Sequence, residues 1–417
     1  MNNQKQSKST GRSVLNILAI VGVLLIIYRL IRGLGASTNL SDGYPWGLWI
    51  GIDIMAGIAM TTGGLIIAVL VLIFGKSKFR PLLKPALLTA FLGYILEIIG
   101  LVPDLGRPWM LWSTIINWNN DSAMFLVAWC VIFQAIFLFT ILAPTIFEKF
   151  KWKAIQNAYD IFVPWVGIFL ITFFVYLVSG ALIWTGITFV LFIILWIIFK
   201  TSVKKDSILL LLAVMGIIIS VSHQTALGTL FVLIPEKLAG LWYTPFLQIN
   251  FLITSIALGL AMIILESTLS SKAFGFGLET NLITSIGKGL LWVLFISIII
   301  RFVTLFDQTG FDFSEAGTGP QIFSFILEIL VGLLIPFILL LSPAKRNSAK
   351  ALYNVAIFVI IGMMINRINV AWVGINSVGY NNYVPYFIEI LVTLGIFSIG
   401  IISFYTISRR FAIFSEH

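Results

Sequence analysis

The sequence predicts an all-α integral membrane protein with about twelve transmembrane helices and both termini in the cytoplasm. Three observations lead to this fold class: an apolar composition, apolar stretches of membrane-spanning length along the whole chain, and an uneven distribution of Lys and Arg between the loops. Hydrophobic residues make up 59% of the 417 residues and charged residues only 10%, whereas a soluble domain carries about 25% charged residues. This composition places the chain in a lipid bilayer.

The apolar stretches are long enough to cross the hydrocarbon core, for which a helix needs about 20 residues. The first follows a polar leader, residues 1–13, that has no small-residue cleavage site, so we expect a retained anchor rather than a removed signal peptide. One long apolar stretch has to turn back on itself, and Ser179-Gly180 is the expected turn. The predicted spans cover residues 14–34, 46–74, 81–102, 122–147, 160–178, 181–199, 207–231, 245–266, 283–306, 320–341, 350–370 and 385–408.

The loops between these spans give the orientation. Cytoplasmic loops of membrane proteins carry an excess of Lys and Arg. Here one side holds most of the basic residues, whereas the other side has Arg32, Arg107, Lys237 and an acidic loop with Asp307, Asp312 and Glu315. The first side is therefore predicted to be cytoplasmic, which makes residues 409–417 a cytoplasmic tail. Its basic segments are the leader and residues 76–84, 149–153, 200–205, 272, 345–350 and 409–410.

Charge and cysteine content exclude several functions. The formal net charge is +9, but the basic residues lie in separate loops and form no run. A nucleic-acid partner is therefore not expected. Cys130 is the only cysteine, which excludes a disulfide framework and a Cys-rich metal site.

Ionisable residues occur inside the predicted spans. Each costs roughly 2.5–3.5 kcal/mol at a helix centre, so such residues face a bundle interior or a cavity. Structural pairing, for example of Arg367 with Glu389, remains an alternative for any one of them, and snorkelling towards the cytoplasm accounts for Glu266 and Lys288. The others share the outer half of the membrane, which favours one polar site there. They are Asp53, Glu97, His223, Arg301, Glu328, Arg367 and Glu389.

His223 lies in the apolar stretch "IIISVSHQTALGTLF", and the only other histidine is His417, the last residue. Three interpretations stay open: a haem ligand, a hydrogen-bonded core residue, or a proton-exchanging group at a bound substrate. A membrane b-type haem usually needs two histidines on facing helices. Since His417 belongs to the cytoplasmic tail, it cannot share an iron with His223. Imidazole has an unperturbed pKa of about 6.5 and exchanges protons readily at neutral pH, which favours the third interpretation.

One outer loop also carries candidate site residues. The segment "GLVPDLGRPW" places Asp104 and Arg107 between Pro103 and Pro108. Proline restricts the backbone, so we expect the acidic and basic side chains to be held in place. Other outer segments are rich in Trp and Tyr, which interfacial aromatic belts explain.

Five motifs together resemble the polysulfide reductase NrfD family. Within that family the likeness is closest to the HybB-type integral membrane subunits of periplasm-facing nickel–iron hydrogenases. The resemblance runs from about residue 40 to the C-terminus. The motifs, in the order in which the family has them, are "YPWGLWIGIDIMAG", "PDLGRPW", "SHQTALGTLF", "LWYTPFL" and "NRINVAWVG".

The resemblance implies two four-helix bundles with flanking helices inside a membrane domain of residues 14–408. The first bundle would cover about residues 46–231 and the second about 245–370, with a last helix at 385–408. Two departures from the family pattern stand out. Residues 155–200 look like an inserted helical hairpin, and the more usual "SHQSSLG" reads "SHQTALG" here.

For function, the resemblance implies a haem-free and metal-free subunit that exchanges electrons between an extracytoplasmic iron–sulfur protein and membrane quinone, with menaquinone expected. Asp53 and His223 would hydrogen-bond the two quinone carbonyl oxygens. Glu97, Asp104, Arg107 and Gln224 would orient the site or supply protons. The remaining charges would support it structurally: Arg301, Glu328, Arg367 and Glu389.

The expected partners are a ferredoxin-like iron–sulfur subunit and a large catalytic subunit, hydrogenase-like or of the molybdopterin type. The expected location is the bacterial cytoplasmic membrane, with the functional face towards the periplasm. A secondary transporter is the alternative, because many spans and buried charges also suit a carrier. Carriers, however, place substrate groups near the midplane on broken helices. A passive membrane anchor is a third alternative, although an anchor has little use for so many buried charges.

Overall fold

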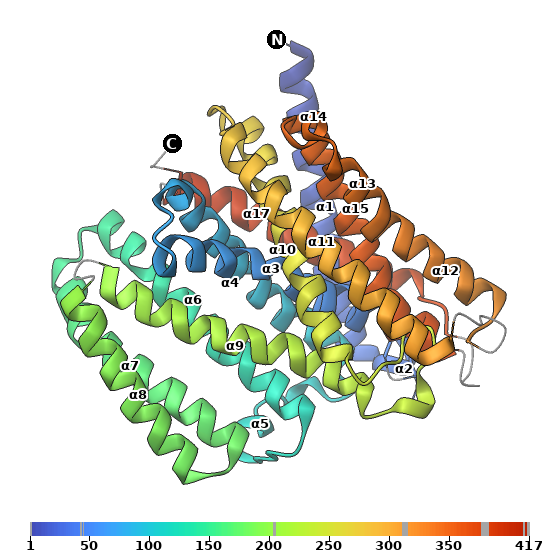
Figure 1. Ribbon diagram of the computed structural model, residues 1–417, viewed down its shortest axis with the longest axis horizontal. Coiled ribbons are helices and arrows are strands. Elements are labelled where there is room, and N and C mark those ends of the chain that lie inside the picture. Colours follow the sequence, from blue (N-terminus) through green and yellow to red (C-terminus); the bar gives the residue numbers. More distant parts are fainter. Residues whose placement is uncertain are drawn as a thin grey trace.

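The computed structural model describes residues 2–41, 44, 46–202, 206–310, 316–376, 383–411 and 413–414, and for residues 2–10 the backbone alone. The described part consists of helices and their connections (Figure 1). Lys205, Asp312, Glu315 and His417, on which the predicted topology and the haem argument draw, lie outside the described residues.

Twelve helical segments of the described chain are long and apolar enough to span a membrane, which confirms the predicted fold class. Three of the spans contain a π-helical segment within or beside an α-helix. The spans are α1 (Asn2–Arg32); η1 (Ile50–Ala56), α3 (Gly57–Ala68) and η2 (Val69–Ile73); α4 (Arg80–Asp104); α6 (Ala123–Phe150); α7 (Lys153–Ser179); α8 (Leu182–Ser202); α9 (Ser207–Val232); α10 (Leu247–Phe274); α11 (Thr280–Thr309); α12 (Gly319–Ile329), η7 (Leu330–Leu334) and α13 (Ile335–Leu341); α15 (Ala349–Ile368) with η8 (Asn369–Val373); and α17 (Phe387–Arg410).

Short helices lie in the connections. They are α2 (Leu34–Ser37), α5 (Ser113–Ile116), α14 (Pro343–Arg346), α16 (Gly374–Asn376), and the 3-10 turns η3 (Ser77–Phe79), η4 (Pro108–Met110) and η6 (Pro235–Lys237).

The ends of the long helices agree with the predicted turns, with one addition at the start of the chain. The polar leader is not separate from the first span, because α1 is helical from Asn2 onward. The expected turn after Ser179 is confirmed: α7 ends there and Gly180 has φ 62°. This left-handed conformation suits glycine at a helix C-terminus, since a Cβ atom would be strained. The hairpin of α7 and α8 then packs at the edge of the molecule, beside α6 and α9 (Figure 1).

Two pairs of helices approach each other closely at glycines. A Cβ atom on Gly63 of α3 would lie 2.6 Å from the carbonyl oxygen of Gly259 on α10. A Cβ atom on Gly22 of α1 would lie 2.7 Å from Cα of Gly395 on α17. Small residues at such crossings let helix backbones pack tightly in lipid, where burial of apolar surface gives no driving force between helices. These contacts hold α1, α3, α10 and α17 in fixed positions around the site described below.

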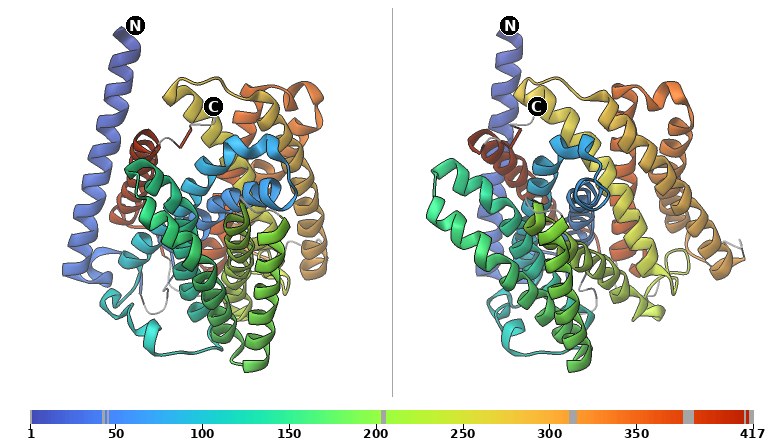
Figure 2. Two further views of the ribbon diagram at one scale, coloured as in Figure 1. Left: turned by 90° about the vertical axis from the view of Figure 1, so that its left-hand side faces the viewer. Right: turned by 60° about the vertical axis from the view of Figure 1, so that its left-hand side comes forward.

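Both the start of α1 and the end of α17 lie at the same end of the bundle (Figure 2). We call this the terminal end, and the opposite end, which carries α2 and α5, the distal end. Odd-numbered spans run from the terminal to the distal end and even-numbered spans run back. Asp53, early in the second span, and Glu97 and His223, late in the third and seventh, are therefore all in the distal half.

The side of the membrane that each end faces remains a prediction from the basic loops. Reporter fusions placed after Lys205 and after Lys350 are expected to report a cytoplasmic location, and a fusion near Asp312 a periplasmic one. The physical reason is the retention of Lys- and Arg-rich loops in the cytoplasm. A periplasmic signal from the fusion after Lys350 would reverse the assignment of the terminal end.

Candidate functional site

Asp53 lies in the π-helical segment η1, at the distal start of the second span. Such segments inside helices often mark functional sites, because the wider turn redirects a side chain. The carboxylate is buried, and Thr393 Oγ1 of α17 donates a hydrogen bond to Asp53 Oδ2 at 2.8 Å. Asp53 Oδ1 has no hydrogen-bond partner among the described residues. On the other side Gly100 of α4 leaves room for Asp53, since a Cβ atom there would come within 3.1 Å of Asp53 Cβ.

A cavity of about 260 Å³ extends from Asp53 along the bundle between α3, α4, α10 and α17. On α10 its lining runs from Met262 to Phe274, which corresponds to roughly 18 Å of helix at about 1.5 Å per residue. Most of its wall is apolar. It reaches the lipid-facing surface, because its lining residues Leu269 and Ile401 are 46% and 53% exposed. The cavity can therefore admit an apolar molecule from the bilayer and bring it to a carboxyl group.

Glu266 is a second carboxylate on this cavity, closer to the terminal end. Thr89 Oγ1 of α4 donates to Glu266 Oε2 at 2.6 Å. The prediction that Glu266 snorkels towards the cytoplasm is therefore wrong: α10 packs against α3 and α4, and its carboxylate is held inside the bundle by Thr89.

His223 is paired with Glu97. The distance from His223 Nε2 to Glu97 Oε1 is 3.3 Å, and both side chains are almost completely buried. His223 does not line the cavity at Asp53, so the expected arrangement of these two residues across one pocket is not what the structure has. The helix α4 explains this: Gly93 and Leu96 face the cavity, whereas the next residue, Glu97, is turned towards α9.

The loop candidates behave differently from each other. Asp104 is the last residue of α4 and is buried, whereas Arg107 is exposed, so the flanking prolines do not hold the two together. The basic residue near Asp104 is instead Arg29 of α1, which interacts with it electrostatically and donates a hydrogen bond to the carbonyl oxygen of Leu105. Arg29 was not among the predicted site residues, although its place inside an apolar stretch was a signal that could have revealed it.

Glu389 lies at the distal end of α17 and accepts hydrogen bonds from the segment before the second span and from the segment before α17. The Tyr383 hydroxyl donates to its carboxylate, and the backbone N–H groups of Tyr386 and Asn39 donate at 3.0 and 3.3 Å. The alternative suggested by the sequence, an ion pair between Arg367 and Glu389, is therefore wrong. Both residues lie in the distal half, but they belong to different faces of the bundle and have separate partners.

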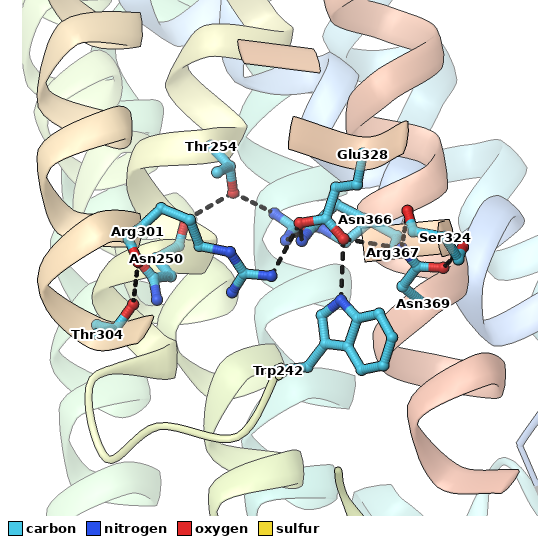
Figure 3. Close-up of polar contacts among 10 residues, drawn as sticks. All are labelled: Trp242, Asn250, Thr254, Arg301, Thr304, Ser324, Glu328, Asn366, Arg367 and Asn369. Carbon is cyan, nitrogen blue, oxygen red and sulfur yellow. Dashed lines mark hydrogen bonds and ion pairs between the residues drawn. The ribbon is translucent and has the colours of Figure 1, made fainter. Parts of the chain in front are cut away.

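Glu328 is the centre of a polar cluster between α11, α12 and α15 (Figure 3). Its carboxylate accepts four hydrogen bonds. The donors are Arg301 Nη2 at 3.0 Å, Asn366 Nδ2 at 2.8 Å, Trp242 Nε1 at 2.9 Å and Asn369 Nδ2 at 2.8 Å. A buried ion pair is stable only when further hydrogen bonds satisfy it, and this one has them. Arg301 and Glu328 therefore form a structural ion pair. The sequence had instead suggested such a pair for Arg367 with Glu389.

Gln224 follows His223 on α9 and points towards α10. The Ser255 hydroxyl donates to Gln224 Oε1 at 2.6 Å, and Gln224 is buried. Of the predicted site residues, the structure thus brings together His223 with Glu97, and Arg301 with Glu328. It leaves Asp53 on the cavity and Arg107 at the surface.

The residues present do not provide a bis-histidine haem site. His223 is the one histidine in the described part of the chain, and its Nε2 atom is directed at Glu97. The described residues also contain no group of three or more His, Cys, Asp or Glu side chains arranged to hold a metal ion.

Comparison with known proteins gives consistent matches. A family model described as "Polysulphide reductase, NrfD" matches residues 36–379. A protein of Nitratidesulfovibrio vulgaris is 26% identical over 426 residues, which cover 100% of this chain and 97% of the relative. The "Probable Ni/Fe-hydrogenase 2 b-type cytochrome subunit" of Escherichia coli K12 is 25% identical over 94% of this chain and 89% of the relative. The "Menaquinone reductase, integral membrane subunit" of N. vulgaris is 23% identical over 82% and 76%.

Proposed function

Because the chain belongs to the polysulphide reductase NrfD family, as its motifs predicted, we propose that it is the quinone-reactive membrane subunit of a respiratory oxidoreductase. In this role it passes electrons between an extracytoplasmic iron–sulfur protein and a membrane quinone, with menaquinone the expected one. The names of two relatives, a menaquinone reductase integral membrane subunit and a hydrogenase subunit, support this class. The chain acts as part of a complex with a ferredoxin-like iron–sulfur subunit and a large catalytic subunit, in the bacterial cytoplasmic membrane with the distal end towards the periplasm.

The observation that carries the proposal is the apolar cavity that runs from the lipid-facing surface to Asp53. Small-molecule sites are mostly apolar, with a few placed polar groups that orient the ligand. A quinone has this chemistry: a ring with two carbonyl oxygens and a long isoprenoid tail. The ring would lie at the Asp53 end, and the tail would leave through the opening beside Leu269 and Ile401.

Reduction of a quinone needs two protons as well as two electrons. Asp53 is placed to hydrogen-bond one carbonyl oxygen and to exchange a proton with it, while Thr393 fixes the carboxyl group through Oδ2. Glu97 and His223 lie behind this wall of the cavity, one helix face away, and form the second proton-exchanging unit. For quinol oxidation the same groups would accept the protons instead.

A pair of glycine substitutions tests the cavity as the quinone site. Gly57 lines the cavity one turn after Asp53, and a Cβ atom there would lie 3.5 Å from the carbonyl oxygen of Ile52, so Gly57→Leu would fill cavity space rather than break a helix contact. We expect the KM for a short-chain naphthoquinone to rise at least about tenfold, the equivalent of 1.4 kcal/mol. Turnover of the intact complex with an artificial dye, which accepts electrons at the catalytic subunit, should not change.

Gly186→Leu is the matched control, because this glycine of α8 has nothing within 4 Å of an added Cβ atom. It makes the same change in a helix far from the cavity and should leave both assays at the wild-type level. Equal quinone kinetics for the two variants would place the quinone outside this cavity.

We also expect the purified subunit to contain no haem, although the E. coli relative is named a b-type cytochrome subunit. The reason is that the described part of the chain places no second histidine opposite His223, whose ring already faces a carboxylate. A reduced-minus-oxidised absorbance spectrum of the purified complex checks this. A b-type α band in a one-to-one ratio with this chain would refute it.

A further inference from the structure

Arg367 is a buried cation whose contacts, among the described residues, are all neutral. The side chain is 2% exposed, and its guanidinium carbon lies 3.7 Å from the centroid of the Phe251 ring. Nη1 donates to Asn366 Oδ1 at 2.8 Å. Nη2 is 2.9 Å from Thr254 Oγ1, 3.2 Å from Ser255 Oγ and 3.1 Å from the carbonyl oxygen of Phe251. Figure 3 shows Arg367 beside, but not bonded to, Glu328.

Burying a cation without a directly bonded anion costs several kcal/mol, and a well-packed apolar residue is often the more stable choice at such a position. The stability of the fold alone therefore does not account for Arg367. The hydrogen bonds of its two terminal nitrogens, Nη1 and Nη2, offer an explanation. Each nitrogen is connected to a different part of the molecule through one neutral residue.

The connection from Nη1 leads to the Glu328 cluster. Asn366 accepts from Arg367 and donates to Glu328 Oε1 at 2.8 Å. The connection from Nη2 leads to the His223 segment. Ser255 accepts from Arg367 and donates to Gln224 Oε1 at 2.6 Å. A continuous set of hydrogen bonds thus crosses from α15 through α10 to α9, and it ends at the residue next to His223.

The direction of these bonds depends on Arg367. A serine hydroxyl has one hydrogen to donate, and Ser255 Oγ lies 2.6 Å from both Gln224 Oε1 and the carbonyl oxygen of Phe251. The guanidinium also donates to that carbonyl and occupies a lone pair of the hydroxyl. The hydroxyl hydrogen is then free for Gln224. Without Arg367, the hydroxyl would donate to its own helix carbonyl and the amide of Gln224 could turn over.

We propose that Arg367 is a positioning residue for the quinone-linked proton site: through Ser255 it fixes the side chain of Gln224 against α10, and so the turn of α9 that carries His223 opposite Glu97. The inference rests on the proposed function, since it concerns the proton-exchanging pair of Glu97 and His223. It assigns to the polar cluster of the second half of the chain a part in quinone turnover, beyond holding helices together.

Two neighbouring substitutions on α10 test this. Ser255→Ala removes the link between Arg367 and Gln224. Thr254→Val is the matched control, because it removes another contact of the same Arg367 nitrogen but none of Gln224. In the intact complex we expect Ser255→Ala to lower kcat with a naphthoquinone by roughly tenfold, since small displacements of positioned groups have large effects on rate. Thr254→Val should keep kcat within about twofold of the wild type, and Ser255→Thr, which retains the hydroxyl, should recover most of the loss.

All three variants are measured for dye-linked turnover and for co-purification of the partner subunits. If Ser255→Ala matches Thr254→Val in quinone kcat, or if its dye-linked turnover falls in parallel, Arg367 is structural only and the inference is overturned. Failure of the proposed function looks different, because the wild-type complex itself would then show no quinone turnover while its dye-linked activity persisted.

Discussion

Replacement of Asp53 by Asn is expected to lower quinone-dependent turnover of the complex by about 10²–10⁴-fold, the usual effect of losing a positioned acid–base group. Asn has nearly the same shape and can still accept the hydrogen bond from Thr393, so the helix contacts of η1 should remain. What it lacks is a proton that a quinone oxygen can take up. The measurement is a pair of assays on the same membranes, one with a naphthoquinone and one with an artificial dye at the catalytic subunit.

Asp160→Asn provides the control for this variant, because Asp160 is an exposed residue of α7 that contacts Gln156 of the same helix. It should leave both activities unchanged. A wild-type rate of quinone turnover in Asp53→Asn would remove Asp53 from the site. A parallel loss of both activities would make its role structural.

The second large effect is expected from the buried pair of His223 and Glu97. His223→Ala removes the imidazole, and Glu97→Gln keeps the shape of its partner but cannot exchange a proton. Each should lower quinone turnover by about 10²–10⁴-fold. Because the two side chains act as one unit, the double variant should be little worse than either single variant, as is found for catalytic residues that work together.

Breaking a buried pair can also destabilise a protein by about 3–5 kcal/mol, so assembly must be measured beside activity. Co-purified partner subunits and an unchanged dye-linked rate would show that the complex is intact. Full quinone turnover in both single variants would return His223 to the role of a hydrogen-bonded core residue. Additive losses in the double variant would contradict the idea of one proton-exchanging unit.

The spans could be predicted from the sequence because the length of an apolar stretch is set by the thickness of the bilayer. Even the turn at Gly180 was found, since glycine interrupts a long run of large apolar residues there. The depth of each charge followed from the same reasoning, which is why Asp53, Glu97 and His223 were correctly expected to lie in one half of the molecule.

Their partners could not be predicted, because depth is only one of the coordinates of a side chain. The direction in which it leaves its helix depends on how the helices are rotated against each other. Leu96 and Glu97 are neighbours in sequence, yet one lines the cavity and the other faces α9. Arg367 and Glu389 lie in the same half but face different helices. The π-helical turn at Asp53 adds a further rotation that no periodicity in the sequence reveals.

The helix α17 has a consequence for how the protein is made. It supplies Thr393, which holds Asp53, and one complete wall of the cavity, while its Gly395 receives α1 at Gly22. The ribosome synthesises α17 after the other helices that line the cavity. Until α17 enters the membrane, α1 lacks a main packing partner, and the cavity beside Asp53 lacks one of its walls. The cavity therefore forms only after α17 has inserted, and a product truncated before α17 lacks this wall and the Thr393 contact to Asp53.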